Sequence, residues 1–64
     1  MRRSRYDCEE FETLCTIVIS INGFSRESAK KIWDFAWDEK HSEGTETVLQ
    51  YSKELLSLVL GVTN

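Results

Sequence analysis

Hydrophobic residues recur at helical spacing in the middle of the chain. They occupy positions i, i+3, i+4, i+7 and i+8 and are Ala29, Ile32, Trp33, Ala36 and Trp37. Residues spaced in this way share one face of a helix. The pattern predicts a helix over residues 25–43.

A second helical pattern follows Gly44 and predicts a helix over residues 45–60. Its apolar positions cover most of the helix circumference toward the C-terminal end; they are Val48, Leu49, Leu55, Leu56, Val59 and Leu60. Gly44 suits the break between the helices, and Gly61 is the expected end of the second one. An antiparallel two-helix hairpin cannot cover this much apolar surface by itself, so the pattern predicts a partner.

The segment 13–21 supports two interpretations. It is rich in β-branched residues, which favour strands, and Ile17, Ile19 and Ile21 alternate onto one strand face. Helical spacing fits an overlapping set, namely Phe11, Leu14, Cys15, Val18 and Ile19. We take a strand over residues 13–21 as the prediction and keep a helix as the alternative.

A strand needs a ladder partner, and the chain holds no second strand pattern. The predicted strand therefore pairs with its copy across a two-fold axis. The predicted fold is α+β and mostly α: one N-terminal strand and a two-helix hairpin, completed by homodimerisation. The alternative is an all-α three-helix fold. The predicted dimer interface consists of Ile17, Ile19, Ile21, Leu55 and Val59.

Length supports the expectation of a dimer. The 64 residues form a single small domain, with residues 1–12 expected as a flexible N-terminal arm. A lone core of this size supplies about 3–5 kcal/mol, so small domains add disulfides, a metal or a second subunit. Cys8 and Cys15 follow no signal-peptide pattern, and no apolar run reaches the ~18–20 residues of a membrane span. We expect a cytoplasmic protein with reduced cysteines.

Charge argues against nucleic acid as a partner. The net charge is −3, whereas affinity for DNA depends on neutralising phosphates. The alternative function is a DNA-binding transcription regulator, with the two helices as a helix-turn-helix around the turn 41–44. Its recognition helix would carry one basic residue, Lys53, where several are normally needed.

The sequence gives little indication of a catalytic or metal site. Cys8 and Cys15 lack the paired spacing of zinc ligands, and His41 is the only histidine. Asp34 and Asp38 share a helix face, with no sign of the burial that general acid–base catalysis requires. We expect neither a metal nor a cofactor, and no enzymatic activity.

Aromatic residues are the best candidates for binding a partner protein, since they dominate interaction hot spots. Trp33 and Trp37 lie on the apolar face, where a core role competes with a binding role. Phe35 lies off that face, and Leu58 is its counterpart on the second helix. The four are the predicted partner-binding residues, and a groove between the helices would suit an amphipathic helix of a host or phage protein.

A motif in this region resembles a known family. It is the run Ile32–Gly44 followed by Glu46–Tyr51, and it contains an aromatic-Ala-Trp, an acidic pair, His, Ser and Gly, then Glu, Val and Tyr. The chain is similar to small early proteins of lambdoid temperate bacteriophages, lambda and Shiga-toxin phages among them, from the region between the exonuclease and excisionase genes. The resemblance covers about two-thirds of the chain and leaves out residues 1–12.

This resemblance implies a dimer whose subunit has one strand and two helices. It also implies early expression in the host bacterial cytosol and a role in favouring lytic over lysogenic development, without enzymatic activity. The expected function is therefore a non-enzymatic phage regulatory protein that binds a protein partner as a homodimer.

Overall fold

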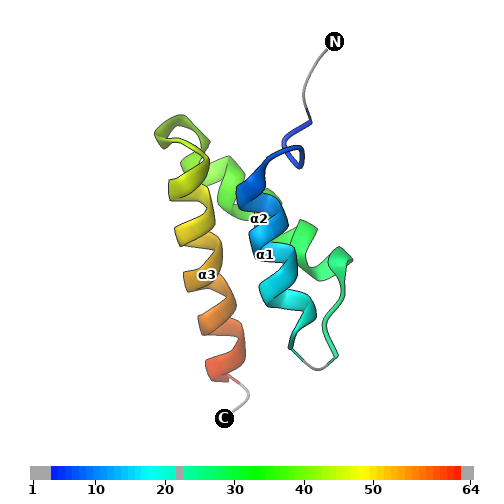
Figure 1. Cartoon of the computed structure of the whole chain (residues 1–64). Helices are drawn as coiled ribbons and strands as arrows, with labels where there is room; N and C mark the ends of the chain where they lie inside the picture. Colours follow the sequence, from blue (N-terminus) through cyan, green and yellow to red (C-terminus); the bar gives the residue numbers. More distant parts are fainter. Residues whose placement is uncertain (1–3, 22, 63–64) are drawn as a thin grey trace.

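The computed structural model describes residues 4–21 and 23–62 of the chain (Figure 1). Over these ranges the fold consists of helices α1 (Glu9–Ile19), α2 (Arg26–Lys40) and α3 (Thr45–Val62), with a short 3-10 turn, η1 (His41–Glu43), between α2 and α3. The described part of the chain contains no strand. The predicted α+β fold is therefore wrong, and the all-α alternative describes the structure.

Burial explains why residues 13–19 are helical. In α1 the side chains of Phe11, Leu14, Cys15 and Val18 lie at helical spacing and are buried in the core. Burying one such side chain is worth about 1.5–3 kcal/mol, whereas β-propensity scales span only about 1 kcal/mol. The segment also has no ladder partner, so tertiary packing outweighs the β-branched composition.

The strand-paired dimer interface is wrong for the same reason. Ile17 in α1 and Ile21, which follows the helix, pack against the core, while Ile19 is 52% exposed. The three isoleucines therefore do not form a common face. Homodimerisation through another surface stays a prediction.

The helix ends differ from the sequence predictions in detail. Residues 9–12, predicted to lie in a flexible arm, form the first turn of α1, whose three glutamates suit the positive end of the helix dipole. Residues 1–3 of that arm lie outside the described residues. The predicted helix 25–43 is divided between α2 and η1, and Gly44 follows with a φ of 104°. The prediction that Gly61 ends the last helix is wrong, because α3 continues to Val62.

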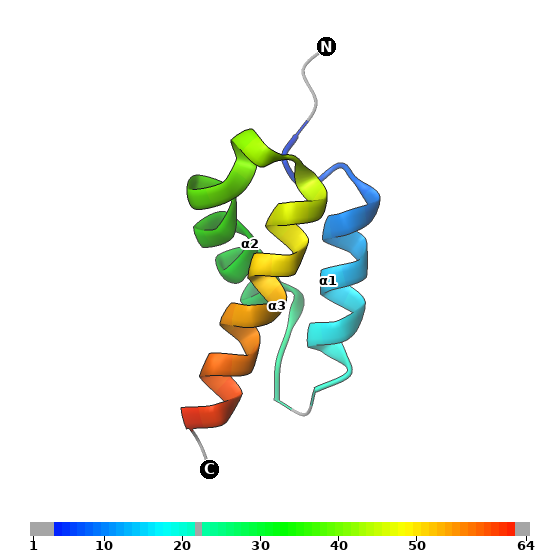
Figure 2. The ribbon, with the colours of Figure 1, turned by 90° about the vertical axis from the view of Figure 1, so that its left-hand side faces the viewer.

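Trp33 lies at the centre of the packing. Helices α2 and α3 pack against each other at an oblique angle, and α1 packs against both (Figures 1 and 2). The Trp33 ring has no exposed surface and meets Phe11 of α1 edge-on, with ring centroids 5.6 Å apart. Ala29 and Ala36, also fully buried, lie one turn from Trp33 on either side. The core is thus built around one large ring supplied by α2.

Two substitutions in α1 distinguish the helix from the strand. Val18→Asp should unfold the protein, since it buries an unpaired charge in a domain whose core supplies about 3–5 kcal/mol. Ile19→Asp should cost only about 0.5–1 kcal/mol, because the side chain is half in water. A strand over 13–21 predicts the reverse order. Urea denaturation followed by circular dichroism measures both.

Candidate interaction surfaces

An apolar groove lies between α2 and α3. It has a volume of about 290 Å³ and is lined by Lys31, Ile32, Phe35, Leu55, Leu58 and Val59. We call these six residues the apolar groove. Phe35 is 57% and Leu58 67% exposed, which is unusual for side chains of this size gathered at one place. The groove is open along its length, and this shape suits a protein surface better than an enclosed small-molecule site.

The predicted interface residues divide between the groove and the core. Leu55 and Val59, predicted for the dimer, line the groove together with Phe35 and Leu58, predicted for a partner protein. Trp33 is fully buried, so its ring is not exposed to a partner protein. Trp37 is half-buried and lies at a different place on α2.

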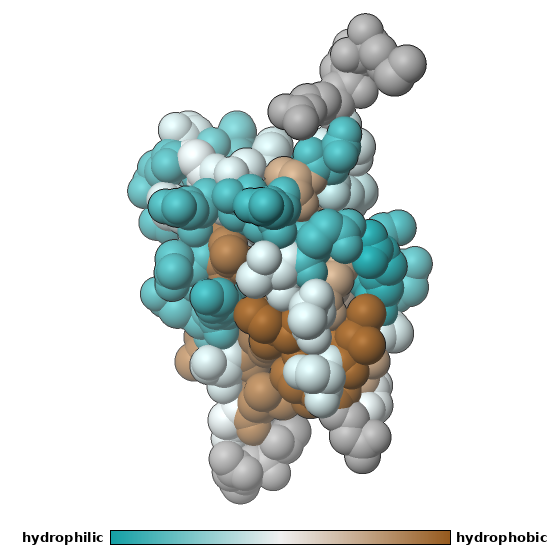
Figure 3. All heavy atoms as spheres, viewed as in Figure 1, coloured by the Kyte–Doolittle hydropathy of each residue, from teal (hydrophilic) through white to brown (hydrophobic). Residues whose placement is uncertain are grey.

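The molecule has a polar and an apolar end. Figure 3 shows hydrophobic surface over the C-terminal half of α3 and the end of α1, and hydrophilic surface toward η1. The stretch 55–62 of α3 contains no charged residue. The groove continues this apolar end onto the side that faces α2.

Residues 4–8 form a second feature, which we call the strap. The carbonyl of Arg5 accepts a hydrogen bond from Trp33 Nε1 at 3.1 Å. The Tyr6 hydroxyl donates to Asp34 Oδ1 at 2.7 Å, and the Arg5 guanidinium pairs with the same oxygen at 3.2 Å. Sequence reasoning missed these contacts, because the partners lie 28 or 29 positions apart and match no motif.

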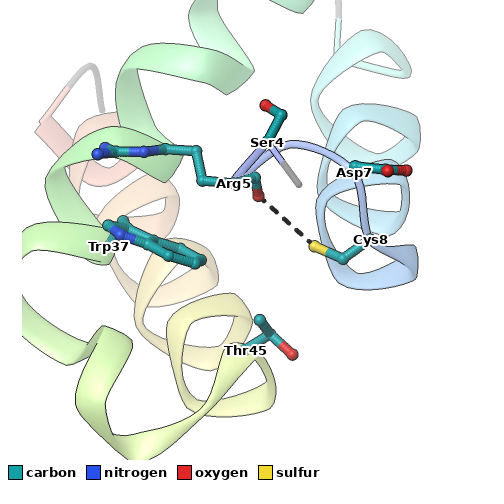
Figure 4. Close-up of a pocket in the computed structure, with 6 residues that line it drawn as sticks. All are labelled: Ser4, Arg5, Asp7, Cys8, Trp37 and Thr45. Carbon is teal, nitrogen blue, oxygen red and sulfur yellow. Dashed lines mark hydrogen bonds between the residues drawn. The ribbon is translucent and has the colours of Figure 1, made fainter. Parts of the chain in front are cut away.

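A small pocket of about 220 Å³ lies beside the strap (Figure 4). The Arg5 side chain extends over the ring of Trp37, with the guanidinium carbon 5.4 Å from the ring centroid. On the strap side the Cys8 thiol donates to the Arg5 carbonyl at 3.7 Å. Thr45 at the start of α3 completes the lining.

Three groups have pKa values that the fold raises. The hydrogen bond from Tyr6 to Asp34, together with burial, raises the Tyr6 pKa. Burial raises the pKa of the Cys15 thiol, which makes it a poor nucleophile near neutral pH. The hydrogen bond to Glu12 raises the pKa of Arg26.

His41 is bound to its own helix end. Its Nδ1 lies 2.7 Å from the Trp37 carbonyl oxygen, and its ring stacks on that of Trp37 with an interplanar angle of 11°. Among the described residues, no group of three or more His, Cys, Asp or Glu side chains is placed to hold a metal ion. In the same part of the chain, no helix has the length and apolar character needed to cross a membrane.

Comparison of the chain with protein-family models, with curated proteins and with solved structures gave no match. The two surfaces are therefore interpreted from their own geometry.

The Tyr6–Asp34 contact predicts a pH dependence. Protonated Tyr6 donates to Asp34 and its folded pKa is raised, so the stabilisation is complete below the usual tyrosine pKa of 10.0. It is lost as the pH rises through the folded value. Asp34→Ala should return the Tyr6 pKa toward 10.0, as measured by tyrosinate absorbance in a Tyr51→Phe background.

Asp38→Ala is the matched control, because this carboxylate lies one turn further along α2 and is exposed. It should leave the Tyr6 titration unchanged. A Tyr6 titration that does not respond to Asp34→Ala would contradict the contact.

Proposed function

We propose that the protein is a non-enzymatic interaction protein that acts as a homodimer, in which the apolar groove of one copy packs against that of the other. One observation carries the proposal: Phe35, Leu58 and Val59 expose large apolar surfaces on one side of α2 and α3. Apolar burial yields about 25 cal/mol per Å². A 64-residue chain with a small core gains stability when this surface is covered.

Charge at the rims of the groove favours a second copy as the occupant. Lys31 stands at the α2 rim, and Glu54 lies one turn before Leu58 on the exposed side of α3. A two-fold axis that runs along the groove sets α2 of one copy against α3 of the other. Lys31 then meets Glu54 of the partner subunit, and the groove is complementary to itself. Exposed pairs of this kind are worth at most about 1 kcal/mol, so they set the register more than the affinity.

The area of a typical dimer interface indicates how much of this chain's surface the dimer must bury. A standard interface buries about 800 Å² per partner, roughly a sixth of the 4641 Å² that this chain exposes. The groove alone is too small for this. The whole layer formed by α2 and α3, about 27 Å long at 1.5 Å per residue for the 18 residues of α3, is long enough to provide it.

The biological role rests on the resemblance of residues 32–44 and 46–51 to small early proteins of lambdoid phages. We infer that the protein is made early in infection, acts in the host bacterial cytoplasm and favours lytic development by binding a protein partner. The DNA-binding alternative gains no support, since the one basic residue of α3, Lys53, is half-buried.

Leu58→Glu should convert the dimer into a folded monomer. The side chain is 67% exposed in one chain, so the fold tolerates the change, while the dimer would bury an unpaired carboxylate. Sedimentation equilibrium over a dilution series measures the association. Ser57→Glu adds the same charge at the neighbouring exposed position outside the groove and should leave the dimer intact. A wild-type protein that is monomeric at every concentration would refute the proposal.

A charge exchange tests the arrangement of the two copies. Lys31→Glu should weaken the dimer, because it sets two carboxylates against each other. Combining Lys31→Glu with Glu54→Lys should restore it, and the coupling is measured as a double-mutant cycle. Effects that simply add would exclude this pairing.

The developmental role is tested in infection. A phage carrying Leu58→Glu should form lysogens more often than the wild-type phage, whereas Ser57→Glu should not change the frequency. Equal frequencies in all three phages would contradict a role for the dimer in lytic development.

A further inference from the structure

The strap is held in the manner of a bound peptide. Its residues 4–8 precede α1 and belong to no helix. The indole N–H of Trp33 donates to the Arg5 carbonyl, so a side chain of α2 binds the main chain of the strap. Residues 4–7 of the strap form a turn, in which the Asp7 N–H donates to the Ser4 carbonyl. The hydrogen bond from Trp33 to a main-chain carbonyl of this turn does not depend on the identity of the bound residue.

The Arg5 side chain occupies a site suited to a guanidinium group. Asp34 supplies a carboxylate oxygen at 3.2 Å, and the ring of Trp37 lies beneath the guanidinium at 5.4 Å (Figure 4). A carboxylate beside an indole face binds arginine through charge, hydrogen bonding and stacking together.

The Tyr6 side chain occupies a neighbouring site for an aromatic ring. Its ring lies 5.0 Å from that of Phe11, and the Lys30 ammonium lies 5.5 Å from the Tyr6 centroid. Its hydroxyl reaches Asp34 Oδ1 at 2.7 Å. The surface of α1 and α2 thus contacts the main chain, a guanidinium and an aromatic ring of one short segment.

These contacts are weak enough to exchange. The side chains of Arg5 and Asp34 are 37% and 44% exposed, and an ion pair this exposed contributes little. The strap is attached to α1 through Cys8, whose backbone is extended with a φ of −156°. A tethered segment competes only at its effective concentration, typically millimolar, so a partner with more contacts can displace it.

We propose that the strap is the intramolecular occupant of a binding site for an arginine–aromatic segment of a partner protein, and that this segment displaces the strap. The residues that contact the strap, namely Phe11, Trp33, Asp34 and Trp37, do not line the apolar groove. The site is built by α1 and α2, whereas the proposed dimer uses α2 and α3.

Full-length protein carrying Arg5→Ala and Tyr6→Ala together retains the strap without its two gripping side chains. The probe is the acetylated and amidated tripeptide Ser-Arg-Tyr, followed by the indole N–H signals of Trp33 and Trp37 in NMR spectra. We expect saturable shifts of both signals in the double variant, and binding about tenfold weaker in the wild type, where the strap occupies the site.

Two controls address the chemistry of the site. The peptide Ser-Lys-Phe retains a cation and a ring but lacks the planar guanidinium and the hydroxyl, so it should bind less tightly. Adding Asp34→Asn to the double variant should weaken binding of Ser-Arg-Tyr about tenfold, the value of a charge-assisted hydrogen bond. Equal binding to wild type and double variant, or no binding to either, would overturn the proposal.

Hydrogen exchange of the wild-type protein tests the proposal even if the double variant fails to fold. If the strap exchanges, the Trp33 indole proton should exchange with solvent much faster than the Val18 amide proton in the middle of α1. Equal rates would mean that the strap opens only when the whole protein unfolds. That result would overturn the proposal.

Discussion

The fold depends on the burial of one side chain, Trp33. In a two-helix hairpin one side of this large ring would be exposed to solvent. In the three-helix fold, Phe11 of α1 covers that side. The indole N–H also needs an acceptor, because a buried donor without one costs about 1–3 kcal/mol. The Arg5 carbonyl supplies it. When the strap leaves, water or another carbonyl must take its place, so the ring that organises the core also lets α2 bind the main chain of another segment.

Local patterns were sufficient to predict α2, α3 and the break at Gly44. The glycine has a positive φ, and the helical spacing on either side can be seen within short windows of sequence. The segment 13–21 was mispredicted because its β-branched residues received more weight than the spacing of Phe11, Leu14 and Val18. Only the packed structure shows that this spacing buries all three side chains in the core, with Phe11 against Trp33. The contacts of Arg5 with Asp34 and Trp37 carry no local signal at all.

The two candidate surfaces differ in chemistry and in place. The apolar groove offers aliphatic and aromatic surface with a single lysine at its rim, which suits the burial of a large, flat area. The site under the strap offers a carboxylate, an indole face and a hydrogen-bond donor, which suits recognition of particular side chains. On the two proposals above, a chain of 64 residues separates assembly from recognition, although the α2 helix contributes to both.

The strap and α2 lie far apart in the sequence, and this separation affects the order in which parts of the chain fold. Helices α2 and α3 are joined by a short turn and can pair early, since closing a short loop costs little entropy. The contacts of Phe11 and Arg5 with Trp33 span more than twenty positions and form later. During synthesis the N-terminal segment nevertheless emerges first. Its β-branched segment has no helix to pack against until α2 leaves the ribosome. The nascent α1 segment is therefore exposed to mispairing with other chains.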